Sequence, residues 1–333
     1  VALFGVVIAP VKGEAIRSWL TLVSYFAIFI SAYHFVRTKE DFRFVIKLVL
    51  WSSALPVLYS IVDIALNAGH AGGPEGYRLK STFGHPNELA FYLTVIIALS
   101  FYMLKSMPPA GQMRTRLFLI FYNFVLLGML ILTKTRGAWA ATLLGFVLYA
   151  LFFQRRYLVY LAVMGVIALF IPGVADRLSD LGQGNEVTTY AQLNSFAWRV
   201  YLWETALQWM TPIRYIFGNG LQSFKEYSPI FFPLAGKVNW GAHSVYVQWL
   251  FELGAIGILT YIWLYYGALR QLKKMLKIER LGAFFLIVVV LNFLLCAISD
   301  NMFEYLSFNW YLWFIVGAGC ALVRFNEPAK RVR

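Results

Sequence analysis

The residues with the clearest potential for chemistry lie where a polar loop meets a strongly apolar segment. His243 is followed by Ser244, nine further residues, Gly254, two more residues and Gly257. This position predicts a titratable imidazole at the first turn of a helix, near the positive end of the helix dipole. That field disfavours imidazolium, and a neutral imidazole is the form that a general base requires.

Two arginines are predicted to share the membrane side of His243. Arg136 lies in a very short connection between two apolar segments, and Arg199 lies in the Trp-rich stretch 196–210. A planar guanidinium can bind a phosphate through two parallel hydrogen bonds. A neutral base beside two fixed cations therefore predicts chemistry on a phosphorylated lipid. The alternative for each arginine is a side chain that reaches out to ordinary lipid phosphates.

Five further polar residues could support this site. They are Lys80, Arg78, Lys134, Asp300 and Ser244. The three basic residues would add positive potential on the same side and concentrate an anionic ligand there. Asp300 could orient His243, pair with an arginine or cap a helix.

Other motif residues are predicted to be structural. Gly254 and Gly257 would serve packing, because small residues let a neighbouring segment approach closely. Pro86 is typical of the first turn of a helix. Cys296 and Cys320 lie inside apolar segments, which favours core packing over a disulfide or a metal site.

The composition predicts an all-α, polytopic transmembrane protein. The chain has 333 residues, of which 60% are hydrophobic and 14% are charged. The apolar residues form runs of about 16 to 25 residues, enough to cross roughly 30 Å of hydrocarbon. Backbone groups in lipid must be satisfied internally, so each run is a helix unless the chain forms a closed barrel. The runs lack the alternating pattern of a barrel.

About ten spans are expected by length. They cover residues 1–11, 16–36, 42–66, 87–107, 116–132, 138–153, 157–171, 243–269, 282–298 and 305–323. The first run is too short to span, and we interpret it as the end of a truncated helix rather than as a signal peptide. This expectation implies a further N-terminal part.

The basic residues predict the orientation. Most of the 29 Lys and Arg residues fall in alternate connections around residues 37–47, 105–116, 155–156, 270–280 and 324–333. The positive-inside rule makes these connections cytoplasmic. The net charge of +13 is then explained by the membrane and not by nucleic acid.

Three segments are predicted along the chain. Residues 1–171 form N-terminal transmembrane helices, 172–242 a long outer loop, and 243–333 the C-terminal transmembrane helices with a cytoplasmic tail. Trp prefers the headgroup level, so the Trp-rich stretch 196–210 predicts an amphipathic helix in the outer interface. It should end before Pro212, and 218–220 predict a tight turn.

Four fragments, in this order, resemble the bacterial O-antigen ligase and polymerase superfamily. They are Gly84-His85-Pro86-Asn87-Glu88-Leu89-Ala90, the turn Thr135-Arg136-Gly137, Arg199-x-x-x-Trp203 followed by Gly218-Asn219-Gly220, and the His243 motif. The resemblance extends from about residue 80 to residue 320.

The resemblance implies a metal-independent glycosyltransferase, without a cofactor, at the periplasmic face of the bacterial inner membrane. The implied donor is O-antigen linked to undecaprenyl diphosphate, and the acceptor is lipid A–core in a ligase or another lipid-linked repeat in a polymerase. His243 would be the catalytic base, with Arg136 and Arg199 binding the diphosphate. Family members commonly have about twelve spans, which agrees with a missing N-terminal part.

Three alternatives stay open. A lipid-linked glycan transporter would carry ionisable residues deep within its spans, whereas Lys47 and Asp63 lie near span ends. A purely structural scaffold gives no reason for basic residues in short outer loops. A polymerase uses the same type of donor, and the complete His243 motif and the long aromatic outer loop favour the ligase.

Overall fold

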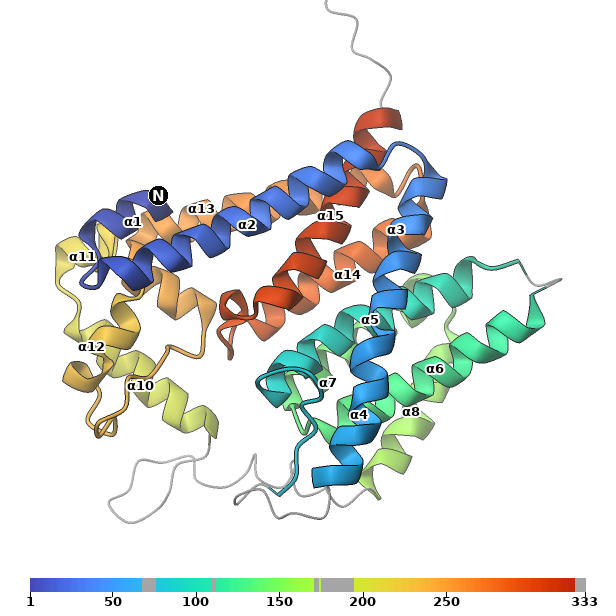
Figure 1. The fold of residues 1–333 in the computed structure, drawn as a ribbon, viewed down its shortest axis with the longest axis horizontal. Coiled ribbons are helices and arrows are strands. Elements are labelled where there is room, and N and C mark those ends of the chain that lie inside the picture. Colours follow the sequence, from blue (N-terminus) through green and yellow to red (C-terminus); the bar gives the residue numbers. More distant parts are fainter. Residues whose placement is uncertain (68–75, 109–111, 171–173, 175–194, 327–333) are drawn as a thin grey trace, which may run out of the picture. The chain divides into compact units, whose positions relative to one another are not determined.

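The structure is a computed structural model that describes residues 1–67, 76–108, 112–170, 174 and 195–326. Helices account for all the regular secondary structure within these ranges (Figure 1). The chain divides into two compact units. Unit 1 contains Val1–Ile28, Leu178–Ala268 and Phe293–Asn309, and unit 2 contains Phe29–Arg177, Leu269–Asn292 and Trp310–Arg333.

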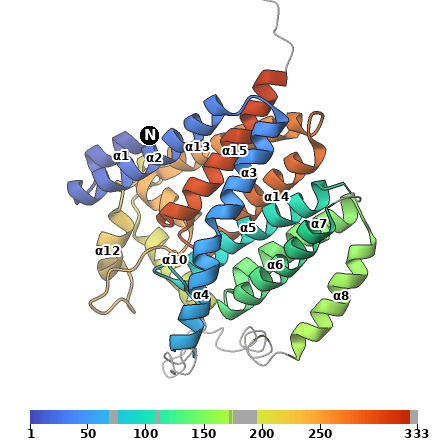
Figure 2. The ribbon, with the colours of Figure 1, turned by 45° about the vertical axis from the view of Figure 1, so that its right-hand side comes forward.

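Unit 2 is built around the helix α5. Its complete helices are α3 (Lys39–Ser52), α4 (Ala54–Asn67), α5 (Pro86–Ser106), α6 (Met113–Leu132), α7 (Arg136–Phe152) and α8 (Arg156–Leu169). α5 packs against α3, α6 and α7, and both ribbon views show α5, α6 and α7 side by side (Figures 1 and 2). Nearly every residue of α5 after its first turn is buried, whereas α8 has no buried residue. α8 packs on α7 along one side, and the exposed apolar residues on its other sides are suited to lipid.

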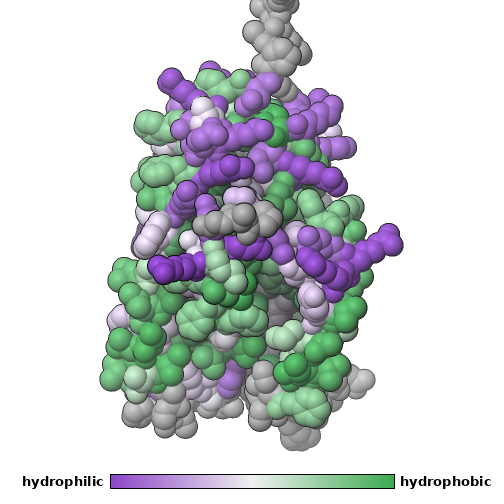
Figure 3. Space-filling model, turned by 90° about the vertical axis from the view of Figure 1, so that its right-hand side faces the viewer, coloured by the Kyte–Doolittle hydropathy of each residue, from purple (hydrophilic) through white to green (hydrophobic). Residues whose placement is uncertain are grey.

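Within the described residues, six helices are long and apolar enough to cross a membrane. They are Lys12–Phe35 (α2), Lys39–Asn67 (α3 and α4 together), Pro86–Ser106, Met113–Leu132, Val245–Met275 (α13) and Leu306–Asn326 (α15). Three shorter apolar helices are α7, α8 and α14 (Arg280–Cys296). On the face shown in Figure 3, hydrophilic residues gather in the upper part of the view and hydrophobic residues in the lower part. The all-helical prediction is confirmed, together with a polytopic membrane protein.

The predicted span 42–66 is interrupted. The structure ends α3 at Ser52 and begins α4 at Ala54. Pro56 lies in the first turn of α4, where it cannot donate a backbone hydrogen bond to the preceding turn. The Ser53 hydroxyl instead donates to the Leu50 carbonyl oxygen and contacts the Tyr122 hydroxyl at 2.6 Å.

Unit 1 contains the Trp-rich helix and its packing partners. Its complete helices are α1 (Ala2–Ile8), α10 (Ser195–Trp209), α11 (Pro212–Phe217) and α12 (Ser223–Phe231), followed by the short 3-10 helix η2 (Met302–Glu304). The predicted helix over 196–210 is confirmed, and Pro212 starts the next helix. Residues 175–194 of the predicted outer loop lie outside the described residues.

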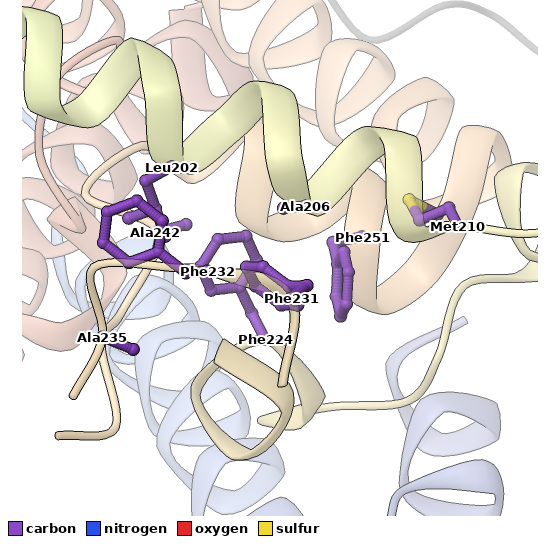
Figure 4. Packing of buried hydrophobic residues seen from close by; sticks show 9 residues of the cluster. All are labelled: Leu202, Ala206, Met210, Phe224, Phe231, Phe232, Ala235, Ala242 and Phe251. Atoms are coloured by element: carbon purple, nitrogen blue, oxygen red, sulfur yellow. The ribbon is translucent and has the colours of Figure 1, made fainter. Parts of the chain in front are cut away.

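One side of α10 faces an aromatic core. Leu202, Ala206 and Met210 recur every fourth residue and are buried. Figure 4 shows them pointing toward the rings of Phe224, Phe231 and Phe251. Side chains four apart lie on one face of a helix, so this stripe fixes which face of α10 points away from the core.

The helix α13 is broken at Gly254. This glycine has φ +67° and ψ −167°, and the carbonyl oxygens before it accept hydrogen bonds from the 218–220 turn. Asn219 donates its amide to Phe251 at 2.9 Å, and Gly220 donates to Glu252 at 2.8 Å. The predicted turn is therefore confirmed by the positive φ of Gly218 and Gly220.

The prediction that Gly254 permits a close approach is confirmed, but the neighbour is the end of α11. A Cβ at Gly254 would stand 2.2 Å from the Ile216 carbonyl oxygen. For Gly257, the nearest atoms belong to Leu253 and Trp249 of its own helix. The first glycine of the motif thus joins two segments, whereas the second packs within α13.

Gly254→Ala is expected to destabilise the protein strongly. The alanine would need a positive φ and would also meet a backbone carbonyl, so we expect a loss of at least about 1–3 kcal/mol in unfolding free energy. Gly267→Ala is the matched control in the same helix, because a Cβ there meets no atom within 4 Å. The control should be neutral or stabilise by about 0.5–1 kcal/mol. Thermal unfolding in detergent measures both, and equal midpoints would contradict the packing role of Gly254.

Candidate active site

His243 lies in a strained turn just before α13. The helix begins at Val245, so His243 precedes the predicted first turn. Its φ is +49°, a left-handed conformation that few non-glycine residues adopt, although Asn, Asp and His adopt it more often than others. Such a conformation persists only where the surroundings impose it.

Hydrogen bonds on both sides of His243 impose this conformation. The Trp203 indole donates to the Ala242 carbonyl oxygen at 2.6 Å. The Ser244 amide donates to Oδ1 of Asn301 at 3.1 Å, and the Val245 amide donates to the Ala297 carbonyl oxygen at 2.9 Å. The backbone is thus tied to α10 before the histidine and to the end of α14 after it.

The helix α10 also brings an aromatic side chain against the histidine. The Trp198 ring lies 5.9 Å from the His243 ring, edge to face, and 4.9 Å from the Trp240 ring. Arg199 is the next residue on α10, and its guanidinium donates to the Ser195 hydroxyl at 2.9 Å. The structure therefore brings the element that carries Arg199 into contact with His243.

Ser244 and Asp300 hold the turns around the histidine. The Ser244 hydroxyl accepts from the Val247 amide at 3.4 Å, as a residue that caps a helix start does. The Asp300 carboxylate accepts from the Tyr305 hydroxyl at 2.6 Å and from the Asn301 amide at 2.9 Å. Both predicted supporting residues are buried and lie in unit 1 with His243.

The other predicted site residues lie in unit 2, around the turn that starts α7. Arg78 holds this turn: its Nε donates to the Thr133 carbonyl oxygen at 2.8 Å. Its Nη2 donates to Oδ1 of Asn87 at 2.8 Å and to the Thr135 hydroxyl at 3.2 Å. Arg78 was expected to add positive potential, and these bonds give it a structural role as well.

Arg136 and Lys134 stand at the start of α7. Arg136 is the first residue of this helix, and Lys134 has φ +53° in the turn before it. A cation at a helix N-terminus opposes the dipole and costs about 0.3–1 kcal/mol. The same helix end, with two cationic side chains, attracts an anion.

Asp63 holds the segment that contains Lys80 and Ser81, just before α5. Its carboxylate accepts from the Ser81 amide at 2.8 Å, the Lys80 amide at 3.2 Å and the Asn67 side chain at 2.9 Å. Burial and the neighbouring Asp63 carboxylate raise the pKa of Tyr77 to about 12. Asp63 therefore fixes the backbone of Lys80, whose side chain is exposed.

Arg78→Lys is expected to loosen the turn before Arg136. Lysine cannot reproduce the fork of three hydrogen bonds, and each bond to a charged group contributes about 1.5–3 kcal/mol. We expect a lower thermal midpoint in detergent and a weaker affinity for an anionic lipid. Lys80→Gln is the control, because the bond from residue 80 to Asp63 is made by its backbone amide. If the thermal midpoints of Arg78→Lys and Lys80→Gln were equal, the three hydrogen bonds of Arg78 would not hold this turn.

The predicted site residues thus form two groups. Unit 1 contains His243, Ser244, Arg199 and Asp300, and unit 2 contains Arg136, Lys134, Arg78 and Lys80.

Sequence reasoning missed Trp198 and Asn301, which contact the histidine turn from distant segments. Cys296 and Cys320 are buried free thiols, as expected. Among the described residues, no group of three or more His, Cys, Asp or Glu side chains is placed to hold a metal ion.

Comparison with known proteins gives one match, to a family model that covers part of the chain. Residues 121–262 match the family model described as O-antigen ligase. The search of curated proteins found no match. The matched segment contains Arg136, Arg199, His243 and the two glycines of the histidine motif. Over this segment, the chain is similar to the O-antigen ligase family.

Proposed function

We propose that this protein is an O-antigen ligase of the bacterial inner membrane. It transfers a glycan from undecaprenyl diphosphate to a sugar hydroxyl of lipid A–core at the periplasmic face. The observation that carries the proposal is the match to the O-antigen ligase family over residues 121–262, because that segment includes all three residues with proposed chemical roles.

His243 acts as the general base. The acceptor hydroxyl oxygen attacks the anomeric carbon of the donor sugar, and its proton passes to the imidazole. The bond from that carbon to the diphosphate oxygen breaks in the same displacement, so the configuration at the carbon inverts. A positioned base contributes about 10²–10⁴-fold to such a step. The contacts that support this role are the fixed turn around His243 and the Trp198 ring against it.

Arg136 and Arg199 stabilise the leaving diphosphate. Negative charge grows on this group as the glycosidic bond breaks, and fixed donors aimed at it lower the barrier by about 3–4 kcal/mol each. Lys134, Lys80 and Arg78 add positive potential around Arg136, and Asp300 supports the turn beside His243. These arginines take the electrostatic role that a divalent cation has in other glycosyl transfers, so transfer should persist in a chelator.

Gene deletion tests the ligase activity. Loss of a ligase leaves long polymer on its lipid carrier and lipid A–core without O-antigen. Complementation with the wild-type gene should restore modified core, and the His243→Ala variant should not. Single repeats still attached to core in the deletion strain would instead identify a polymerase, which is the alternative function within the same superfamily.

A detergent assay excludes the transporter alternative. A glycosyltransferase moves glycan between lipids without a sealed vesicle, whereas a transporter requires two compartments. Purified protein that transfers no glycan in mixed micelles, but moves lipid-linked glycan across a vesicle membrane, would contradict the proposal.

A further inference from the structure

A buried asparagine lies under the histidine turn and contacts it at both ends. Asn301 is 5% exposed and belongs, like the turn, to unit 1. Its Oδ1 accepts the Ser244 amide at 3.1 Å, directly after His243. Its Nδ2 lies 2.5 Å from the point where a Cβ of Gly241 would stand, two residues before His243. One side-chain amide therefore spans the four-residue turn 241–244.

The amide is held in one orientation. Nδ2 donates to Oε1 of Glu304 at 3.2 Å, while Oδ1 faces the Ser244 amide. A rotation that exchanged oxygen and nitrogen would place two acceptors together at Glu304 and two donors together at Ser244, and both arrangements are unfavourable. The Asn301 backbone amide also donates to Asp300 at 2.9 Å. The glutamate thus determines which atom of the Asn301 side chain faces the Ser244 amide.

The turn needs such a support. His243 has a positive φ, and a residue in this conformation keeps it only where neighbouring bonds oppose relaxation. Trp203 holds the carbonyl oxygen before the histidine, and Asn301 holds the amide after it. The Val245 amide stays bonded to Ala297, so loss of the Asn301 bond releases the constraint only on the peptide between His243 and Ser244. A shift of this peptide moves the imidazole with it.

We propose that Asn301, oriented by Glu304, is a positioning residue for His243. It acts through the backbone on either side of the histidine and sets where the ring stands relative to an acceptor hydroxyl. The inference rests on the proposed function for its effect on transfer, but its effect on the histidine ring can be measured without any substrate. A misplacement of about 1 Å at a reacting group can reduce the rate about 100-fold.

Exchanging the hydrogen-bond donor and acceptor between residues 301 and 304 tests whether Glu304 orients Asn301. Asn301→Asp keeps an oxygen for the Ser244 amide but places a carboxylate oxygen against Glu304. The double variant N301D/E304Q restores a donor–acceptor pair with the roles reversed. Glu304→Ala is a second single variant, which removes the carboxylate that accepts from Nδ2 of Asn301. Asn326→Asp, at the end of α15, is the matched control for the same chemical change elsewhere.

The first readout is the ring signal of His243 in protein labelled with ¹³C-histidine. The chain has four histidines, and loss of one signal in His243→Asn assigns the resonance. We expect this signal to move in Asn301→Asp and in Glu304→Ala, to return in the double variant and to stay in Asn326→Asp. A signal that stays at its wild-type position in both single variants would overturn the proposal, whatever the transfer activity.

The second readout is the rate of glycan transfer. We expect Asn301→Asp to lower kcat about 100-fold with little change in the KM for the donor, and the double variant to recover most of the loss. A loss of rate that accompanies a lower thermal midpoint, with neither restored in the double variant, would indicate a general folding role and overturn the proposal. If the ring signal responds as expected but the wild-type protein transfers no glycan, Asn301 still positions His243 and the proposed function fails alone.

Discussion

His243→Asn is expected to lower glycan transfer by about 10²–10⁴-fold while the protein folds normally. Asparagine is chosen because it tolerates the left-handed conformation of residue 243 better than most residues. The backbone turn should therefore survive, and only the imidazole is lost. Donor binding should persist, because we propose that the arginines, and not His243, bind the diphosphate. Transfer from purified lipid-linked donor to a core acceptor measures the rate, and equilibrium binding measures the affinity.

Comparison with His243→Ala separates the effect of losing the imidazole from the effect of disturbing the turn. Alanine removes the base and also disfavours the positive φ, so this variant should show the same catalytic loss and a lower thermal midpoint. A His243→Asn variant with wild-type transfer would remove the histidine from the mechanism. Loss of donor binding in His243→Asn would assign the residue to the donor site rather than to proton transfer.

Arg136→Lys is expected to lose nearly as much glycan-transfer activity as Arg136→Ala. Lysine keeps the charge but lacks the planar fork that holds two phosphate oxygens. Removal of one fixed donor from a site of developing charge costs about 10²–10³-fold in kcat. We expect the same for Arg199→Lys, measured in the same transfer assay with folded protein in detergent.

An exposed cation on the same predicted side of the membrane provides the control. Lys237 lies on the surface of unit 1, so Lys237→Gln removes one positive charge without removing a proposed phosphate ligand. Its transfer rate should stay within about twofold of wild type, since exposed charges interact weakly. If Arg136→Lys retained full activity, simple charge attraction would be sufficient and the bidentate role would be wrong.

Features with a strong local signal were predictable from the sequence. Apolar runs marked the helices, Pro86 marked the start of α5, and the aromatic stretch 196–210 marked α10 to within one residue. The turn at 218–220 followed from its two glycines. In each case, the property that determines the structure is carried by residues next to one another.

The contacts that hold the site were not predictable in this way. Arg78 reaches Thr133, and Asn301 reaches Ser244, across separations of 55 and 57 residues. The break at Gly254 depends on a carbonyl oxygen of Ile216 that no local pattern indicates. A single sequence shows which residues can form such bonds, but not which distant segment will provide the partner.

The central claim is that His243 and the arginines act in one transition state, and a double-variant cycle tests it most directly. Transfer rates would be compared for wild type, His243→Asn, Arg136→Lys and the double variant in detergent micelles. Residues that act on one step are strongly non-additive, so the double variant should be barely slower than the slower single variant. A double variant whose loss equals the full product of the two single losses would contradict the claim.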